Sequence, residues 1–231
     1  MHVNAIVVAA GEGRRMGVLI PKPFLPIGGR AILLRAVDHL AKSQNIKKII
    51  LVAAAGELAR CDRLLREADV NSRQWILQSG GVTRQASVRQ GLDKIDTHCD
   101  VVVIHDGVRP FVSPSLVDRC IEAAPTKGAV VLGVPVRDTI KVVSRDGWVQ
   151  ATPAREGLWE IQTPQAFRRD LIVEAHEWAL RQQIEATDDA MLVEKMGHGV
   201  FVLEGARTNI KITAAEDLLF AEALLREGRV G

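Results

Sequence analysis

The sequence predicts an α/β protein whose largely parallel, Rossmann-like sheet is flanked by helices. Short unbroken runs of Val, Ile and Ala alternate with longer stretches in which apolar residues recur at helical spacing. Unbroken apolar runs are typical of strands that helices cover on both faces. A glycine-rich turn directly follows the first of these runs, and open α/β sheets bind ligands beyond the carboxyl ends of their strands.

The alternation extends over the whole chain of 231 residues, so we expect a single domain spanning residues 1–231. The expected strands are Ala5–Ala9, Lys48–Ala53, Gln74–Gln78, Val101–His105, Ala129–Pro135 and Val200–Glu204. Apolar residues at helical spacing predict helices around residues 32–40, 58–68, 116–121 and 215–223.

The segment at about 138–154 breaks this alternation. Two short runs of β-branched residues surround Asp146 and Gly147, and an Asp-Gly pair in this setting predicts a β-hairpin. A hairpin inserted late in an α/β domain often serves as an arm. A simple edge hairpin is the alternative.

The composition limits the possible partners. The 30 basic and 28 acidic side chains leave a formal charge of only +2, so the chain as a whole does not attract nucleic acid or an anionic membrane. The three cysteines form no C-x-x-C pair, which argues against a disulfide framework or a structural zinc site and fits a reducing cytoplasm. The first apolar run is too short to span a bilayer. We therefore expect a cytoplasmic protein with a local anion-binding site.

The loop after the first strand carries that site. Gly11 and Gly13 allow backbone N–H groups to approach phosphate oxygens, and Arg14, Arg15 and Lys22 add positive charge. Cations beside a glycine-rich loop favour a triphosphate. The third glycine of the dinucleotide fingerprint is replaced by Met16, and no acidic residue follows the second strand. An NAD-dependent oxidoreductase is therefore a remote alternative, as is a catalytically inactive nucleotide-binding module.

The loop, A-A-G-E-G-R-R-M-G followed by P-K, resembles the signature of the sugar nucleotidyltransferases. Further motifs follow it in order at residues 80–88, 105–110, 135–141, 155–159, 162–167, 187–189 and 209–213. With them, nearly the whole chain resembles the 2-C-methyl-D-erythritol 4-phosphate cytidylyltransferase family. The resemblance implies a fold of the nucleotide-diphospho-sugar transferase type, with a β-arm used for dimerisation. It also implies transfer of CMP from CTP to the polyol phosphate, with release of pyrophosphate, in non-mevalonate isoprenoid biosynthesis.

The resemblance assigns a CTP site by position. The residues that would wrap the phosphates and ribose are Ala9, Ala10, Gly11, Glu12 and Gly13. Arg15 and Lys22 would contact the triphosphate and stabilise the transition state. Gly81, Val82 and Ser87 would recognise the cytosine. Asp106 would serve a Mg²⁺ cofactor and lie near the ribose and the substrate, with Gly107 beside it.

The acceptor site follows in the same way. Arg109, Thr139 and Lys211 would hold the methylerythritol phosphate, and Lys211 would join Arg15, Lys22 and Arg155 as a catalytic residue. In this family the arm crosses into a second subunit. Arg155, Thr163 and Thr187 would then contribute to the polyol-phosphate site of the partner.

Three positions depart from the family's pattern. Pro23 stands where a Gln is usual, and Val82 stands where an acidic residue can occur. Gly107-Val108 replaces the frequent Ala-Ala and is closer to the related ribitol-5-phosphate cytidylyltransferases. The motifs at Ser87-Val88 and at residues 135–139 favour the methylerythritol branch, so ribitol 5-phosphate is the alternative acceptor.

The implied chemistry agrees with the residue types. A phosphate monoester has a second pKa near ~6 and is largely ionised at neutral pH, so it attacks without a Ser, Cys or His nucleophile. The difficulty is the approach of one anion to a polyanion, which fixed cations and a divalent metal overcome by positioning and charge stabilisation. His105 precedes Asp106 and could be read as a general base, but we expect it to be a packing residue at the end of a strand.

Overall fold

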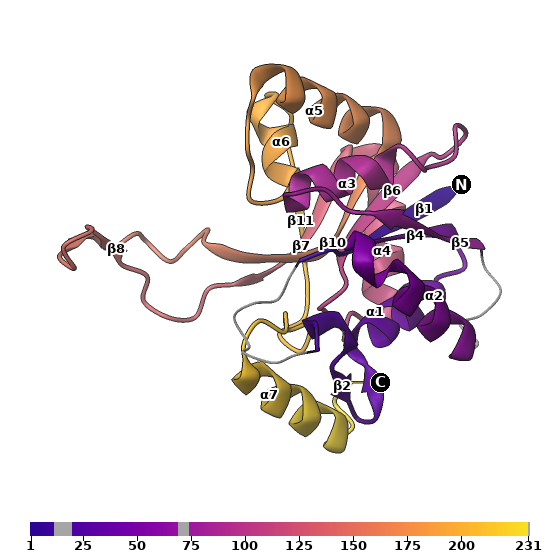
Figure 1. Ribbon diagram of the computed structural model, residues 1–231. Coiled ribbons are helices and arrows are strands. Elements are labelled where there is room, and N and C mark those ends of the chain that lie inside the picture. The colour runs from indigo at the N-terminus through magenta and orange to yellow at the C-terminus, as the bar shows by residue number, and fades with distance from the viewer. Residues whose placement is uncertain (12–19, 69–73, 231) are drawn as a thin grey trace.

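The computed structural model describes residues 1–11, 20–68 and 74–230. Its core is a seven-stranded sheet in the order β11-β7-β10-β6-β1-β4-β5 (Figure 1). The strands are β1 (Val3–Ala9), β4 (Ile46–Ala53), β5 (Gln74–Ser79), β6 (Val101–Asp106), β7 (Ala129–Pro135), β10 (Trp159–Arg168) and β11 (Phe201–Glu204). The mostly parallel α/β fold is confirmed, and all six expected strands are present within two residues.

One strand was not expected. β10 runs antiparallel between β6 and β7, pairing with both. Its centre is buried although it carries Gln162, Thr163 and Gln165. Polar residues around Pro164 hide a strand from a search for apolar runs, because such a search assumes that buried strands are apolar.

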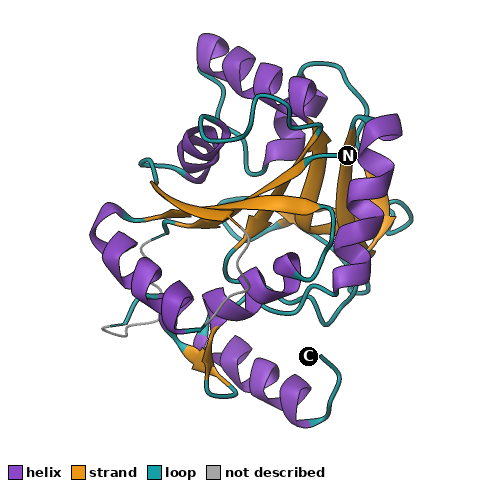
Figure 2. Ribbon diagram, turned by 90° about the vertical axis from the view of Figure 1, so that its right-hand side faces the viewer, coloured by secondary structure: helices purple, strands orange, loops and turns teal. Residues whose placement is uncertain are grey.

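Helices cover both faces of the sheet (Figures 1 and 2). One layer contains α1 (Ile32–Ala41), α2 (Leu58–Glu67) and α4 (Pro114–Lys127), which share one apolar core with the sheet. The other contains α3 (Arg84–Leu92), α5 (Arg169–Gln182) and α6 (Asp189–Lys195), which pack into a second core. The expected helices are confirmed as α1, α2, α4 and α7 (Ala215–Arg226). The sequence did not predict α3, α5 and α6.

A small third core attaches α7 to the segment after the glycine-rich loop. This segment contains η2 (Lys22–Phe24), β2 (Pro26–Ile27) and β3 (Arg30–Ala31), and a second short helix, η3 (Ala55–Glu57), precedes α2. Pro23 is buried in the first turn of η2, where a proline's fixed φ and missing N–H are tolerated. Local packing therefore accounts for Pro23 in place of the family's usual Gln.

The segment at about 138–154 forms a hairpin that projects from the body (Figure 1). β8 (Val142–Val143) pairs with β9 (Val149–Ala151) in a two-stranded sheet of its own, so the hairpin is not an edge of the main sheet. Gly147 has a φ of 86° at the expected turn. Trp148 is 78% exposed and Val149 is 58% exposed. The arm therefore carries apolar surface that the chain itself does not cover.

No helix in the described ranges combines the length and the apolar character needed to cross a membrane.

Candidate active site

Four parallel strands end together at one edge of the sheet. The register places Val8 beside Asp106, Ala9 beside Ala53, and Ala53 beside Ser79. The loops that follow β1, β4, β5 and β6 therefore begin at the same edge. This is the position at which open α/β sheets bind ligands.

Two of these loops touch through small residues. The Gly80 N–H donates to the Ala53 carbonyl at 2.8 Å, and a Cβ placed on Gly80 would lie 2.4 Å from that of Ala10. No side chain fits at position 80 without moving the loop that begins at Ala10. Ala9 and Ala10 are half-buried here, and Gly11 is exposed. Glu12, Gly13 and Arg15, which the sequence assigns to this loop, lie outside the described residues.

Gly107 is equally confined. Its N–H donates to the Val8 carbonyl at 2.9 Å, and a Cβ at this position would lie 3.0 Å from the Leu33 side chain and 3.2 Å from the Ala9 Cβ. These contacts are tighter than side chains normally make. The glycine that departs from the family's pattern thus has a packing reason, which is independent of the choice of acceptor.

The loop before α3 is fixed by hydroxyl groups. The Ser87 hydroxyl donates to the Thr83 carbonyl at 2.9 Å and accepts from the Gly81 N–H at 3.1 Å. Thr83 caps the helix by accepting from the Ala86 N–H at 3.0 Å. The Val82 side chain is fully exposed. The loop therefore presents its backbone, and Ser87 is a buried brace behind it.

Asp106 is the centre of the site. Its carboxylate forms an ion pair with Lys211 Nζ at 2.7 Å and accepts a hydrogen bond from Arg84 Nε at 3.2 Å. Arg109 Nε lies 3.9 Å away. Burial alone would raise the pKa of Asp106, but these three cations more than offset it and hold the pKa well below its usual range. The carboxylate is therefore ionised throughout the physiological pH range.

Arg84 connects Asp106 to a second buried acid that the sequence did not single out. Arg84 Nη1 donates to Asp189 at 2.7 Å, and His176 Nε2 lies 3.1 Å from the other oxygen of Asp189. Burial lowers the pKa of Arg84, but its two acidic partners reverse the effect and raise it. Both Arg84 and Asp189 stand inside the quoted motifs at residues 80–88 and 187–189. Their neighbours in the sequence are mostly polar, so no local pattern indicates this pair.

The segment at 209–213 brings Lys211 to Asp106 and contacts Lys22. Asn209 is buried and donates to the Thr163 carbonyl at 2.9 Å, and its own carbonyl accepts from Arg109 Nη1 at 2.8 Å. The Ile212 N–H donates to the Val108 carbonyl at 2.9 Å, which places Lys211 beside Asp106. Lys22 Nζ donates to the Thr213 carbonyl at 3.2 Å. Asp106, Arg109 and Lys211 therefore lie together, and Lys22 contacts the carbonyl of Thr213, two residues after Lys211.

Comparison with known proteins decides the family. The family model for 2-C-methyl-D-erythritol 4-phosphate cytidylyltransferase matches residues 3–227. The chain belongs to this family. A relative of that name from Caldanaerobacter subterraneus is 41% identical, with 98% of this chain and 100% of the relative covered. Another, from Syntrophotalea carbinolica, is 42% identical, with 97% of each covered.

Solved structures agree with this assignment. A 4-diphosphocytidyl-2C-methyl-D-erythritol synthase from Anaerococcus prevotii has a TM-score of 0.87 at 34% identity, covering 97% of this chain and 96% of that chain. The enzyme of the same family from Thermus thermophilus has a TM-score of 0.79 at 36% identity, covering 98% of this chain and 100% of that one. The expected family, fold and enzyme class, a nucleotidyltransferase, are confirmed. An NAD-dependent oxidoreductase is not the family found.

Three residues that the resemblance assigns to the cytidylyltransferase's acceptor site, Thr139 directly and Arg155 and Thr187 in trans, are dispersed. Arg155 is exposed and donates to the Arg137 carbonyl at 2.6 Å near the base of the arm. Thr139 is exposed just before β8, and Thr187 is exposed before α6, where it contacts Met191 at 3.7 Å. Within one chain, none of these three has a recorded contact with Asp106 in the described ranges.

Thr163 lies elsewhere than the sequence suggested. Its side chain is buried behind Asp106 of its own chain, where it accepts from the Asp106 N–H at 3.0 Å and lies 3.1 Å from His105 Nδ1. Within one chain this hydroxyl therefore fixes the backbone at Asp106. A contribution of Thr163 to the site of a partner subunit stays a prediction.

His105 is the packing residue that the sequence predicted. It is fully buried, and its Nε2 lies 3.0 Å from the Arg109 carbonyl. Burial lowers the pKa of His105 to about 4, so the ring is neutral at physiological pH. It supports the loop that carries Arg109.

Proposed function

We propose that this chain transfers the CMP unit of CTP to the phosphate of 2-C-methyl-D-erythritol 4-phosphate, releasing pyrophosphate, through the cluster of cations around Asp106. The observation that carries the proposal is the meeting of Lys211, Arg109 and Asp106 at the carboxyl edge of the sheet, beside the backbone loops at 9–11 and 80–82. Family membership supplies the substrates, since the relatives bear that name.

The arrangement suits the chemistry because it supplies charge without a nucleophile. The acceptor phosphate is already ionised, with a second pKa near ~6. Lys211, which pairs with Asp106, would hold it together with Arg109, and Lys22 would reach the triphosphate. Such preorganised cations stabilise the charge that moves onto pyrophosphate. The proposed roles of Glu12, Gly13 and Arg15 rest on the family's pattern alone.

The nucleotide base would lie against the loop at 81–87. Val82 is exposed there, and Ser87 fixes the loop by accepting from the Gly81 N–H. Backbone donors and acceptors can recognise a cytosine edge without a specific side chain. Ala9, Ala10, Gly11 and Gly107 would leave room for the ribose and phosphates, because none of them has a large side chain.

Asp106 also fits a Mg²⁺ cofactor, in a limited way. Mg²⁺ in nucleotide enzymes is often bound by one or two carboxylates together with substrate phosphates and water. Asp106 can supply one oxygen if the Lys211 ammonium group leaves it to form an ion pair with a phosphate. When bound, the ion would neutralise charge on the triphosphate. The chain's own lysines and arginines would supply the rest of the charge stabilisation.

We further propose that the enzyme is a homodimer, cytoplasmic in location, with the arm crossing to the partner. The exposed Trp148 and Val149 on β8–β9 support this, because apolar surface of this kind marks an interaction site. Arg155 and Thr187 would then complete the acceptor site of the partner, to which the partner itself would contribute its own Thr139.

Pyrophosphate release tests the reaction. The full chain is incubated with Mg²⁺, one of the four NTPs, and either methylerythritol phosphate or ribitol 5-phosphate. We expect turnover with CTP and methylerythritol phosphate as the preferred pair. Faster turnover with ribitol 5-phosphate would replace the proposed acceptor, and the absence of pyrophosphate with every pair would indicate an inactive nucleotide-binding module.

A further inference from the structure

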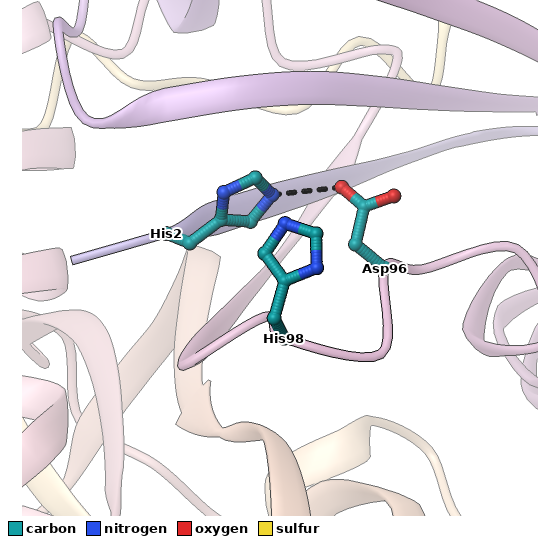
Figure 3. A group of neighbouring side chains, drawn as sticks. All are labelled: His2, Asp96 and His98. Atoms are coloured by element: carbon teal, nitrogen blue, oxygen red, sulfur yellow. Dashed lines mark hydrogen bonds and ion pairs between the residues drawn. The ribbon is translucent and has the colours of Figure 1, made fainter.

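A second polar cluster lies at the opposite end of the sheet from Asp106. β1 and β6 are parallel, so His2 and the loop before β6 mark the amino ends of these strands. One potential ligand atom from each of His2, Asp96 and His98 gathers there, and the three atoms lie within 4.8 Å of one another. Figure 3 shows the two imidazole rings side by side, with the carboxylate next to them.

The backbone that carries these side chains is held in place. The His2 carbonyl accepts from the Asp100 N–H at 2.8 Å, and the His2 N–H donates to the Asp100 carboxylate at 2.7 Å. A turn from Asp96 to Cys99 encloses His98, closed by a 3.1 Å hydrogen bond. The buried side chain of Asn4 accepts from the Asp96 N–H at 2.7 Å. The three residues are therefore brought together by the fold itself.

The carboxylate of Asp96 is oriented by its neighbours. One oxygen pairs with Lys48, and the other lies 2.7 Å from His2 Nε2 and 3.1 Å from Asn4 Nδ2. Ligand carboxylates in metal sites are commonly held by such outer partners. Lys48 occupies one oxygen and leaves the other facing the two imidazoles.

We propose that His2, Asp96 and His98 bind a divalent transition-metal ion, with Zn²⁺ as the best match, at a site separate from the reaction centre. Three protein ligands leave a fourth position for water. Two imidazoles favour Zn²⁺ over Mg²⁺ or Ca²⁺, which prefer oxygen ligands. The buried Cys99 is not a ligand, since its thiol donates to the Val101 carbonyl at 3.1 Å.

Binding requires a small closure of the side chains. Tetrahedral ligands about 2.0–2.1 Å from Zn²⁺ lie roughly 3.3 Å apart, whereas the three ligand atoms here are only within 4.8 Å of one another. His98 is exposed, and its ring meets that of His2 with 4.2 Å between centroids, so rotation of its side chain can bring a nitrogen inward. The positive charge of Lys48 opposes the incoming cation and limits the affinity. The bound ion would connect the chain's first strand to the loop before β6.

The test uses the full-length chain without a histidine tag, stripped of metal and titrated with Zn²⁺ in excess Mg²⁺. Calorimetry is expected to show one Zn²⁺ per chain. His98→Ala should weaken binding at least about tenfold, as losses near a metal commonly do. His198→Ala is the matched control, because His198 is also exposed but lies far along the chain, after α6. It should leave the affinity unchanged.

Two further readouts separate a specific site from surface binding. Co²⁺, used as a coloured probe, should give the absorption of a tetrahedral complex in the wild type and lose it in His98→Ala. Zn²⁺ should raise the Tm of the wild type but not that of His98→Ala, whose metal-free Tm shows that it folds. Equal Zn²⁺ affinity in the wild type and His98→Ala, or displacement of Zn²⁺ by Mg²⁺, would overturn the proposal.

Discussion

Replacing Arg84 with Met removes the cation that joins the two buried acids. Arg84 donates to Asp189 at 2.7 Å and to Asp106 at 3.2 Å. The Asp106 side chain would keep Lys211, but Asp189, whose side chain is 1% exposed, would keep only His176. Leaving one partner of a buried pair uncompensated costs about 3–5 kcal/mol. We expect a loss near the lower end, about 3 kcal/mol, because His176 Nε2 stays 3.1 Å from Asp189.

Chemical unfolding of the wild type, Arg84→Met and Arg84→Met/Asp189→Asn measures this cost. The second substitution removes the uncompensated charge, so it should restore a large part of the lost free energy of unfolding. Arg89→Met is the control, since Arg89 lies on the same helix and no ion pair is recorded for it in the described part of the chain. We also expect kcat to fall roughly 10–10²-fold, the scale of a small misplacement in an active site.

The pH dependence supplies an independent check. In the wild type the pKa of Asp189 is lowered from 3.8: burial opposes ionisation, but Arg84 and His176 outweigh it. Without Arg84, burial dominates, and the folded pKa rises above the unfolded one. A carboxyl group with a raised folded pKa stabilises the fold only at low pH. The loss of unfolding free energy in Arg84→Met should therefore be smaller at pH 5 than at pH 8. A pH-independent deficit, or no recovery in the double variant, would refute this reasoning.

Five other variants and one pH dependence test the proposed roles. Lys211→Ala should lower kcat by about 10²–10³ with little change in the unfolding free energy, because the side chain is 41% exposed; an unchanged rate of pyrophosphate release would exclude the role. Arg155→Ala should raise KM for methylerythritol phosphate, and an equal loss of CTP affinity would contradict an acceptor role. Val82→Ala should change KM for CTP by less than about twofold, whereas Gly81→Ala should impair CTP binding, since its Cβ would lie 2.6 Å from that of Ala86. His105 is fully buried and has a pKa of about 4. Because only the unfolded ring takes up a proton as the pH falls from 7 to 4, the unfolding free energy should drop by up to about 3 kcal/mol over this range. His105→Gln should flatten this decline in chemical unfolding curves.

The elements that could be predicted from sequence share one physical property. β6 and β7 are buried on both faces, so each begins with an unbroken apolar run, Val101–Ile104 and Ala129–Leu132, that is easily recognised. β10 is buried too, but its polar side chains are satisfied by partners distant in the chain, such as Asp188 for Gln165 at 2.7 Å. α3 was missed for a related reason, since only Val88 and Leu92 give its buried face an apolar pattern.

The site shows the same division. Asp106, Arg109 and Lys211 could be grouped in advance because the family's motifs mark them, and the structure brings them together. The bond from Arg84 to Asp189 spans 105 residues, and no local pattern indicates which acid an arginine will find. The burial of Thr163 was equally hidden, because it depends on β10 lying between β6 and β7.

The unequal exposure of the three cations around Asp106 suggests how the site accommodates phosphate. Arg84 is fixed by its second bond to Asp189, and Arg109, 12% exposed, is held by the Asn209 carbonyl. Lys211 is the most exposed of the three and reaches Asp106 through a flexible side chain. An arriving phosphate can therefore draw Lys211 away while the two arginines continue to neutralise Asp106. Because the exchange leaves no buried carboxylate unpaired, the site can change partners without the cost that removing Arg84 would impose.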